Sequence, residues 1–195
     1  MKQYFNENPE ILTNERLLRL SIFDRKFSFL ANNGLFSCDK VDAASIILLE
    51  NIPALTGRVL DLGCGYGTIG IVLAKINHIQ LTMSDVNRIA LDYAAKNAKL
   101  NQVTARLIHS DGFDALSGEY DSIILNPPIH AGKEVMYRLY AGAARYLSQG
   151  GAFYIVIQKK HGAESAIKIL SGIFTECNVL YKKKGIYVLQ CMGGI

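Results

Sequence analysis

Four residues that follow a short apolar run, Asn126-Pro127-Pro128-Ile129, have the composition of a group that holds a flat amine. The run Ser122 to Leu125 predicts a buried strand, and two prolines cannot continue the hydrogen-bond ladder of a sheet. Neither proline has an N–H, so the carbonyl oxygens here and the Asn126 amide oxygen can accept from a ligand. When both hydrogens of an NH2 group are held by acceptors, its nitrogen changes from planar towards tetrahedral geometry and becomes a nucleophile. Taken alone, an Asn-Pro pair after a strand is more commonly a rigid turn.

A second segment, Asp61-Leu62-Gly63-Cys64-Gly65-Tyr66-Gly67-Thr68-Ile69-Gly70, follows an earlier apolar strand and opens a helix. Its glycines let the backbone turn sharply and approach a ligand, and the first N–H groups of the helix point at that ligand. The segment also fits G-x-G-x-x-G with Asp85 downstream, the pattern of NAD-binding enzymes. A carboxylate at Asp61 suits the cationic amino-acid end of S-adenosylmethionine better than a pyrophosphate. We therefore favour that ligand over a dinucleotide, and a strand-turn-helix that binds nothing is the remaining alternative.

Acidic residues follow the next two predicted strands. Asp85 ends one of them, where a carboxylate can accept both hydroxyls of a ribose or can cap the helix over 87–100. Ser110-Asp111-Gly112-Phe113 follows the other, and Asp-Gly there also predicts a plain turn. The carboxyl ends of parallel strands meet at one edge of a sheet, so these residues and Asn126 are expected to lie close together.

The elements that must position these residues alternate from residue 58 onward between short apolar runs and helical patterns. This alternation predicts an α/β fold with a parallel sheet that is covered on both faces. The predicted strands are Arg58–Leu62, Gln80–Ser84, Ala105–His109, Ser122–Leu125 and Ala152–Ile157. The clearest predicted helices are Asn87–Leu100 and Lys133–Leu147, the second closed by Ser148-Gln149-Gly150-Gly151.

The two ends of the chain depart from this alternation. Asn178–Lys182 and Ile186–Cys191 are joined by a link too short for a parallel crossover, so they predict an antiparallel hairpin. Near the start, Phe27–Leu30 and the residues after Asn32-Asn33-Gly34 predict a second hairpin, followed by a helix over 39–49 with Ser37 as its N-cap. We predict a single domain over 1–195, in which 1–50 is an N-terminal extension and 51–195 is the core.

Composition restricts the class of protein. The chain has 195 residues, of which half are hydrophobic and 19% are charged, which fits one folded domain and argues against disorder. No apolar run approaches a membrane span, and the start lacks a signal-peptide core, so we expect a soluble, cytoplasmic protein without a membrane partner. Its four cysteines form no C-x-x-C pair, so no metal is expected. The net charge of +4 is compatible with a nucleic-acid partner.

The motifs resemble those of a known family. The glycine-rich segment is similar to motif I of the S-adenosylmethionine-dependent methyltransferases, and a parallel sheet with one reversed strand is similar to their class I fold. With Gly34-Leu35-Phe36-Ser37 and Asp39-Lys40-Val41-Asp42 upstream, Asn126 to Lys133 resembles the bacterial small-subunit (16S) ribosomal RNA guanine-N2 methyltransferases over about residues 20–192. The resemblance implies a three-layer Rossmann-like fold whose seven strands have the order 3-2-1-4-5-7-6, with the last strand antiparallel.

The resemblance also implies roles for individual residues, with S-adenosyl-L-methionine as the cofactor. In such a site Asp111 contacts the adenine amine, with Gly112 and Phe113 beside the ring. The predicted catalytic residues are Asn126, Pro127, Pro128 and Ile129. The predicted cofactor-binding residues are Asp61, Gly63, Cys64, Gly65, Gly67, Asp85, Val86, Asp111, Gly112, Phe113 and Asn126.

Position 129 bears on the acceptor. Adenine-specific and glutamine-specific relatives carry an aromatic residue there, which stacks on the acceptor, whereas this chain has Ile129. Guanine is therefore favoured, with Phe36 or Phe113 as a possible stacking face. In the expected reaction the amine attacks the sulfonium methyl group in line, and proximity does most of the catalysis. His130 either takes up the released proton or makes a polar contact with RNA.

Lysines after the later strands predict an RNA-binding rim. Lys159 and Lys160 follow the fifth strand together with His161, and the second cluster lies in the final hairpin; solvated loops are the alternative for each. The predicted substrate-binding residues are Phe36, His130, Lys133, Lys159, Lys160, Lys182, Lys183 and Lys184. Two alternative functions remain open: methylation of another amino acceptor, such as a protein glutamine or a nucleic-acid adenine, and RNA binding without catalysis.

Overall fold

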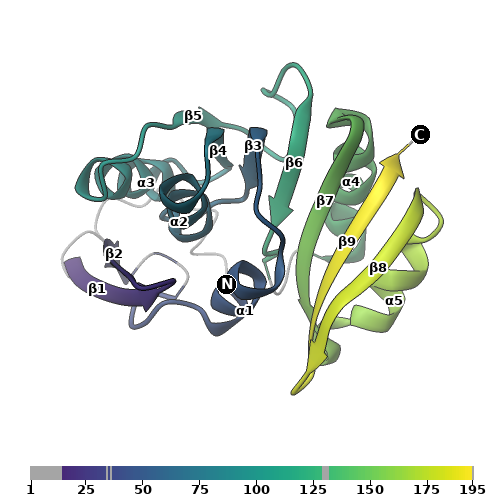
Figure 1. The fold of residues 1–195 in the computed structure, drawn as a ribbon, viewed down its shortest axis with the longest axis horizontal. Coiled ribbons are helices and arrows are strands. Elements are labelled where there is room, and N and C mark those ends of the chain that lie inside the picture. The colour runs from purple at the N-terminus through teal and green to yellow at the C-terminus, as the bar shows by residue number, and fades with distance from the viewer. Residues whose placement is uncertain (1–14, 34, 36, 129–131, 195) are drawn as a thin grey trace.

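The computed structural model describes residues 15–33, 35, 37–128 and 132–194, and a seven-stranded sheet lies at their centre (Figure 1). Its strand order is β5-β4-β3-β6-β7-β9-β8, and only β9 runs antiparallel to its neighbours. Counted from β3, this is the predicted order 3-2-1-4-5-7-6 with its reversed last strand, so that prediction is confirmed. The strands are β3 (Gly57–Leu62), β4 (Ile79–Asp85), β5 (Arg106–His109), β6 (Tyr120–Leu125), β7 (Leu147–Gln158), β8 (Phe174–Lys183) and β9 (Ile186–Gly194).

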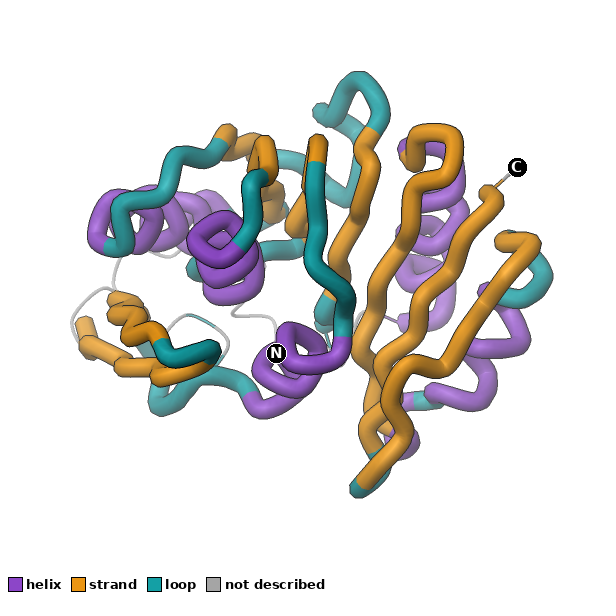
Figure 2. The backbone as a smooth tube through the Cα atoms, viewed as in Figure 1, coloured by secondary structure: helices purple, strands orange, loops and turns teal. Residues whose placement is uncertain are grey.

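Helices cover both faces of the sheet, which gives three layers (Figure 2). The central strands are apolar on both sides because successive side chains point to opposite faces: Ile123 belongs to the core under one layer of helices and Ile124 to the core under the other. One layer contains α1 (Ala43–Asn51), α2 (Thr68–Ile76) and α3 (Arg88–Leu100), and the other contains α4 (Gly132–Tyr146) and α5 (Ala163–Leu170).

The predicted core elements agree with the observed ones within a few residues, except at the start of β7. The helix α4 ends at Tyr146, close to the predicted end. The segment Ser148 to Gly151, predicted as a helix stop, is already part of β7, where Leu147 pairs with Tyr120 and the register then shifts. Gly150 has a φ of +77°, a conformation that favours glycine at this irregularity.

The N-terminal hairpin is displaced from its predicted place. It consists of β1 (Glu15–Ile22) and β2 (Arg25–Asn32), so Phe27 to Leu30 lies in its second strand and the turn is Phe23-Asp24. Both turn residues have positive φ values, 53° and 56°, as a two-residue hairpin turn requires. The prediction was wrong because Asn32-Asn33-Gly34 has the stronger turn composition, whereas Phe23-Asp24 has little.

The N-cap of the following helix was also predicted wrongly. Asp42 caps α1, and its Oδ2 accepts a hydrogen bond of 2.9 Å from the backbone N–H of Ser45. Ser37 lies upstream, where its hydroxyl donates to the carbonyl of Lys40. The helix therefore begins at Ala43, later than predicted, because an aspartate nearer the apolar run provides the cap.

Two asparagines on α3 attach the hairpin to the core. Asn97 accepts from the N–H of Leu30 at 2.7 Å and donates to its carbonyl at 2.9 Å, and Asn101 pairs with Ser28 in the same way at 3.2 and 2.8 Å. Residues four apart share one face of a helix, so the two side chains satisfy the edge of β2 as a neighbouring strand would. Asn97 also donates to the carbonyl of Tyr66 at 2.9 Å, which ties the hairpin to the glycine-rich segment.

Two features are absent from the described part of the chain. None of its helices is both long enough and apolar enough to cross a membrane. No three His, Cys, Asp or Glu side chains there gather as a metal site would require.

Candidate active site

The segments predicted to form a site follow strands whose last residues lie side by side in the sheet. Leu62, at the end of β3, pairs with Ser84 of β4 on one side and with Leu125 of β6 on the other. The glycine-rich segment, Asp85 and Asn126 therefore leave the carboxyl edge side by side. Ligands bind at this edge in open α/β sheets.

The carboxylate of Asp61 is buried beneath the first turn of α2. Its side chain is 1% exposed, and Oδ2 accepts from the N–H of Gly70 at 2.7 Å. Burial raises the pKa of Asp61 to about 7, against the lowering effect of that hydrogen bond, and the neighbouring charge of Asp85 adds to the rise. A cation bound beside Asp61 would restore its ionised form, so this corner is suited to an ammonium group.

Asp85 fixes the glycine-rich segment against the end of β4. Its Oδ2 accepts from the N–H of Gly65 at 2.8 Å, and its Oδ1 accepts from the N–H of Asn87 at 2.9 Å. Asn87, not Asp85, is the N-cap of α3. Gly63 and Gly65 have φ values of +66° and +56°, and a Cβ on either would meet nothing within 4 Å. Open space therefore adjoins the backbone here, where a ligand could approach closely.

Other predicted cofactor residues make contacts within the protein. The pKa of the Cys64 thiol is raised well above its ordinary value, mainly by burial, so this thiol stays neutral. The carbonyl of Val86 lies 2.9 Å from Nε2 of His109. Gly67 is the N-cap of α2, with a φ of +90°.

The segment after β5 is tied to α4. Asp111 forms an exposed ion pair of 2.5 Å with Arg138. Phe113 is buried with its ring 4.8 Å from that of Tyr146, and a Cβ on Gly142 would meet the Phe113 ring at 2.3 Å. Phe113 thus belongs to the core beneath α4 and is absent from the lining of the cavity described below, so it provides no stacking face there.

The side chain of Asn126 is held by residues from the other end of the chain. Its Nδ2 donates to Oδ2 of Asp42 and to Oγ of Ser45, each at 2.8 Å. A carboxylate can only accept, so the amide nitrogen must face α1 and the amide oxygen must face the other way. No group of the described residues donates to that oxygen, so it is placed to accept from a ligand.

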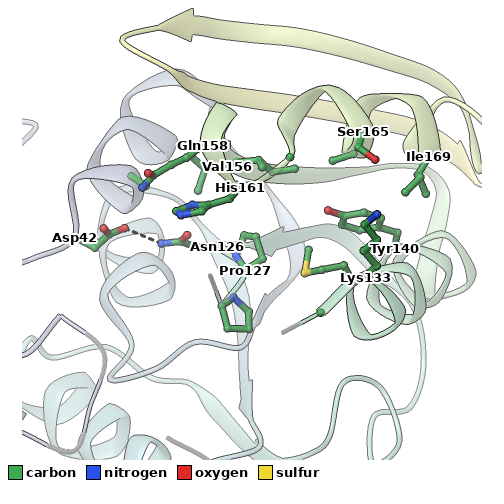
Figure 3. A pocket seen from close by; sticks show the side chains of 17 residues that line it. Asp42, Asn126, Pro127, Lys133, Tyr140, Val156, Gln158, His161, Ser165 and Ile169 are labelled. Carbon is green, nitrogen blue, oxygen red and sulfur yellow. Dashed lines mark hydrogen bonds between the residues drawn. The ribbon is translucent and has the colours of Figure 1, made fainter. Parts of the chain in front are cut away.

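A cavity of about 250 Å³ opens beside Asn126 (Figure 3). It lies between the start of α1, the prolines after β6, α4, the end of β7 and α5. His161 and Gln158 lie near Asn126, whereas Tyr140, Ser165 and Ile169 lie towards the opposite end (Figure 3). The lining residues are Asp42, Ala44, Asn126, Pro127, Pro128, Gly132, Lys133, Met136, Tyr140, Val156, Ile157, Gln158, His161, Gly162, Ser165, Ala166 and Ile169.

The two predicted lysine clusters meet beside this cavity. Lys159 and Lys160 follow Gln158 in a short 3-10 turn, and the N–H of Lys159 donates to the carbonyl of Gly185 at 2.7 Å. Gly185 follows directly after Lys182 to Lys184, and because β8 is parallel to the core strands, this turn lies at the carboxyl edge. Two of the lysines have partners: Lys159 pairs with Glu164 at 3.7 Å, and Lys182 lies over the ring of Tyr187 at 5.1 Å.

Some predicted residues cannot be placed, and some site residues were missed. Phe36, Ile129 and His130 lie outside the described residues. Asp42, Ser45 and Gln158 were not predicted as site residues, and His161 was assigned only to the basic rim. Asp42 and Ser45 have the spacing of a helix cap, which signals a helix start but gives no sign that the cap faces Asn126.

Comparison with known proteins identifies relatives along nearly the whole chain. The profile of the family described as methyltransferase small domain matches residues 26–190. Uncharacterized protein YbxB of Bacillus subtilis (strain 168) is 36% identical over 195 residues, covering 97% of both chains. Ribosomal RNA small subunit methyltransferase C of Vibrio cholerae is 35% identical over 157 residues, which are 76% of this chain and 44% of that protein.

The most informative structural neighbour is the T. thermophilus 16S rRNA N2 G1207 methyltransferase (RsmC) in complex with AdoMet and guanosine. It has a TM-score of 0.84 and 28% identity, over 96% of this chain and 53% of that chain. A methyltransferase from Pyrococcus furiosus has a TM-score of 0.66 at 23% identity and shares the fold. The chain spans about half the length of the ribosomal RNA methyltransferases that it matches.

Proposed function

Because this chain belongs to the methyltransferase small domain family, we propose that it transfers a methyl group from S-adenosyl-L-methionine to the exocyclic N2 amine of a guanine in 16S ribosomal RNA. One observation carries the proposal: the Asn126 amide is locked with its oxygen away from Asp42, beside a cavity and level with the glycine-rich segment. The ribosomal RNA methyltransferases among its relatives, and the guanosine bound to the T. thermophilus enzyme, support the choice of acceptor.

The residues at the carboxyl edge fit the cofactor. Asp61 would hold its ammonium group, which also explains why the chain tolerates a buried carboxylate of raised pKa. The carboxylate of Asp85 at the end of β4 would accept from ribose hydroxyls, and the open space beside Gly63 and Gly65 would admit the ligand. Asp111, Gly112 and Phe113 remain assigned to the adenine end, and Val86 remains a predicted cofactor-binding residue. When bound, the cofactor supplies an electrophilic methyl group.

The acceptor half would orient the amine. Oδ1 of Asn126 and the carbonyl of Pro127 accept its two hydrogens and direct the nitrogen lone pair at the methyl group, while Pro128 lines the cavity beside the base. Ile129 stays a catalytic residue predicted from the sequence. Orientation and proximity then lower the barrier, and the nitrogen becomes acidic only as the methyl group arrives. His130 and Phe36 lie outside the described residues; His130 stays predicted either to take up the released proton or to contact RNA, and Phe36 to contact the substrate.

A phosphate-binding rim would hold the RNA. Lys159 and Lys160 meet the end of the β8–β9 hairpin, which carries Lys182 to Lys184, next to the cavity, and Lys133 lines the cavity itself. Their combined charge at one edge suits the backbone of RNA, where lysines position the strand without reading its sequence.

The test is to incubate the protein with labelled S-adenosyl-L-methionine and unmodified 16S rRNA, both free and in small subunits, and to digest the product to nucleosides. We expect N2-methylguanosine, and an Asn126→Ala variant that binds the cofactor normally should produce almost none. Label in N6-methyladenosine, or in a ribosomal protein with no labelled guanosine, would overturn the choice of acceptor. Absence of cofactor binding by calorimetry would overturn the enzymatic function altogether.

A further inference from the structure

We infer that Asp42, assisted by Ser45, is a positioning residue that fixes the Asn126 amide for methyl transfer. The inference rests on the proposed function and extends it to a segment 84 residues upstream of Asn126. It concerns how the acceptor oxygen is aimed, and it gives Asp42 no contact with the reacting atoms.

The hydrogen bonds converge on one carboxylate oxygen. Oδ2 of Asp42 accepts from Nδ2 of Asn126 at 2.8 Å, from the N–H of Ser45 at 2.9 Å and from Oγ of Ser45 at 3.2 Å. Oγ of Ser45 also accepts from Nδ2 of Asn126 at 2.8 Å, so both amide hydrogens of Asn126 have partners. An Asn side chain can otherwise rotate by half a turn and exchange its donor and acceptor ends. Here the flipped rotamer would set the amide oxygen against a carboxylate, so a single orientation is favoured.

Charge adds to this orientation. A hydrogen bond from an amide NH2 to an ionised carboxylate is stronger than one to a neutral acceptor, and it polarises the amide so that its oxygen becomes a better acceptor. The amine that Asn126 holds gains positive charge as it is methylated. A fixed negative group one side chain away favours that change more than it favours the neutral ground state.

The chain supplies this pair through a helix start. Asp42 caps α1, Ser45 lies in its first turn, and Ser45 is 6% exposed, so the helix holds both side chains in the protein without RNA. Asn126 is held at the end of a central strand and is followed by two prolines. The two rigid elements meet at Asp42 and Asn126 beside the cavity (Figure 3).

The decisive variant is Asp42→Ser. Serine is as good an N-cap as aspartate, so α1 keeps its cap while Asn126 loses the carboxylate. We expect kcat to fall by about 10- to 100-fold, with KM for RNA and the cofactor dissociation constant changed less than about twofold. Asp42→Asn retains an oxygen acceptor without the charge and should give a smaller loss. Asp39→Asn removes an exposed carboxylate that pairs with Arg16, and it serves as the matched control with unchanged kcat.

A double-mutant cycle separates positioning from a general structural role. In an Asn126→Ala background, Asp42→Ser should reduce kcat by less than about twofold further, because its effect acts through the Asn126 amide. Additive losses, or a KM increase at unchanged kcat, would overturn the inference. The same holds if the loss follows a lowered melting temperature.

A readout that does not depend on methylation keeps this inference distinct from the proposed function. The side-chain NH2 of Asn126, observed by NMR in the protein without RNA, should exchange with solvent at least about tenfold faster in Asp42→Ser than in wild type. If the proposed substrate is wrong but exchange accelerates, the positioning contact stands and only the acceptor changes. If exchange is equal in both proteins, the contact does not hold the amide and the inference fails.

Discussion

The cofactor half and the acceptor half of the site are assembled over very different sequence distances. In the cofactor half, Asp61 contacts Gly70 nine residues away, and Asp85 contacts Gly65 twenty residues away. In the acceptor half, Asn126 is held by Asp42 and Ser45, which are 84 and 81 residues away. The contacts of the cofactor half join residues within two consecutive strand-helix units, whereas the contacts of the acceptor half form only when α1 packs beside β7.

The largest expected effect comes from a variant that disrupts only the acceptor half of the site. Replacing Asn126 with Ala removes the oriented acceptor and should lower kcat by about 10²- to 10³-fold, comparable to loss of one oxyanion-hole donor. Calorimetry should show a cofactor affinity within about twofold of wild type, because the Asp61 and Asp85 contacts do not pass through Asn126. A parallel loss of cofactor affinity would mean that the two halves are not separable.

This separation explains how much the sequence could predict. The alternation of strands and helices, the antiparallel final hairpin and the placement of Asp61, Asp85 and Asn126 at one edge follow from local patterns and from the rule that parallel strands end together, whereas the strand order was implied by the family resemblance. The partners of Asn126 do not, since a cap such as Asp42 has the same local pattern wherever its helix packs. The hairpin turn was missed because a contact between distant residues outweighs a local pattern. Asn97 and Asn101 on α3 fix the register of β2, and this overrides the turn composition of Asn32-Asn33-Gly34.

The second-largest expected effect is a loss of stability when the hydrogen bonds between the N-terminal hairpin and the cofactor half are removed. Asn97 is fully buried and bonds to Leu30 on β2 and to the carbonyl of Tyr66 in the glycine-rich segment. Asn97→Ala leaves these backbone groups unpaired and should lower the free energy of unfolding by about 2–3 kcal/mol. Chemical denaturation measures that loss, and cofactor affinity should fall with it.

Asn101→Ala is the matched comparison, because that side chain makes the same kind of contact to Ser28 from the C-cap of α3 but is 9% exposed, whereas Asn97 is 0% exposed. Water can replace some of its bonds, so we expect about 1 kcal/mol and an unchanged cofactor affinity. Equal effects of the two variants would remove the special role given to the Tyr66 contact.

A third prediction sharpens the cofactor half through pH. Burial raises the pKa of Asp61 to about 7, and the carboxyl must ionise to hold an ammonium group. Cofactor affinity should therefore be about tenfold weaker at pH 6 than at pH 8, with proton release detectable by calorimetry in buffers of different ionisation enthalpy. Asp61→Asn should bind weakly and without this pH dependence.

The same residue makes a prediction for the protein without cofactor. The pKa of Asp61 is raised from 3.8 to about 7, so the folded chain binds this proton more tightly than the unfolded chain does. The stability that the proton contributes is fully present below about pH 3.8 and is lost as pH rises through about 7. The difference in stability between wild type and Asp61→Asn should change over this range and be constant above it.

The smallest expected effect is a loss of RNA affinity when lysines of the proposed phosphate-binding rim, beside the acceptor half, are replaced. Replacing Lys182, Lys183 and Lys184 together with Ala should weaken RNA binding by roughly three- to tenfold at moderate salt and reduce the dependence of affinity on salt concentration. The matched control replaces Lys75, Lys96 and Lys99, which lie on α2 and α3 far from β8 (Figure 1). The net charge falls equally in both variants, so an equal loss would assign the effect to overall charge. A loss confined to the first variant places the RNA backbone along the edge that carries Asn126.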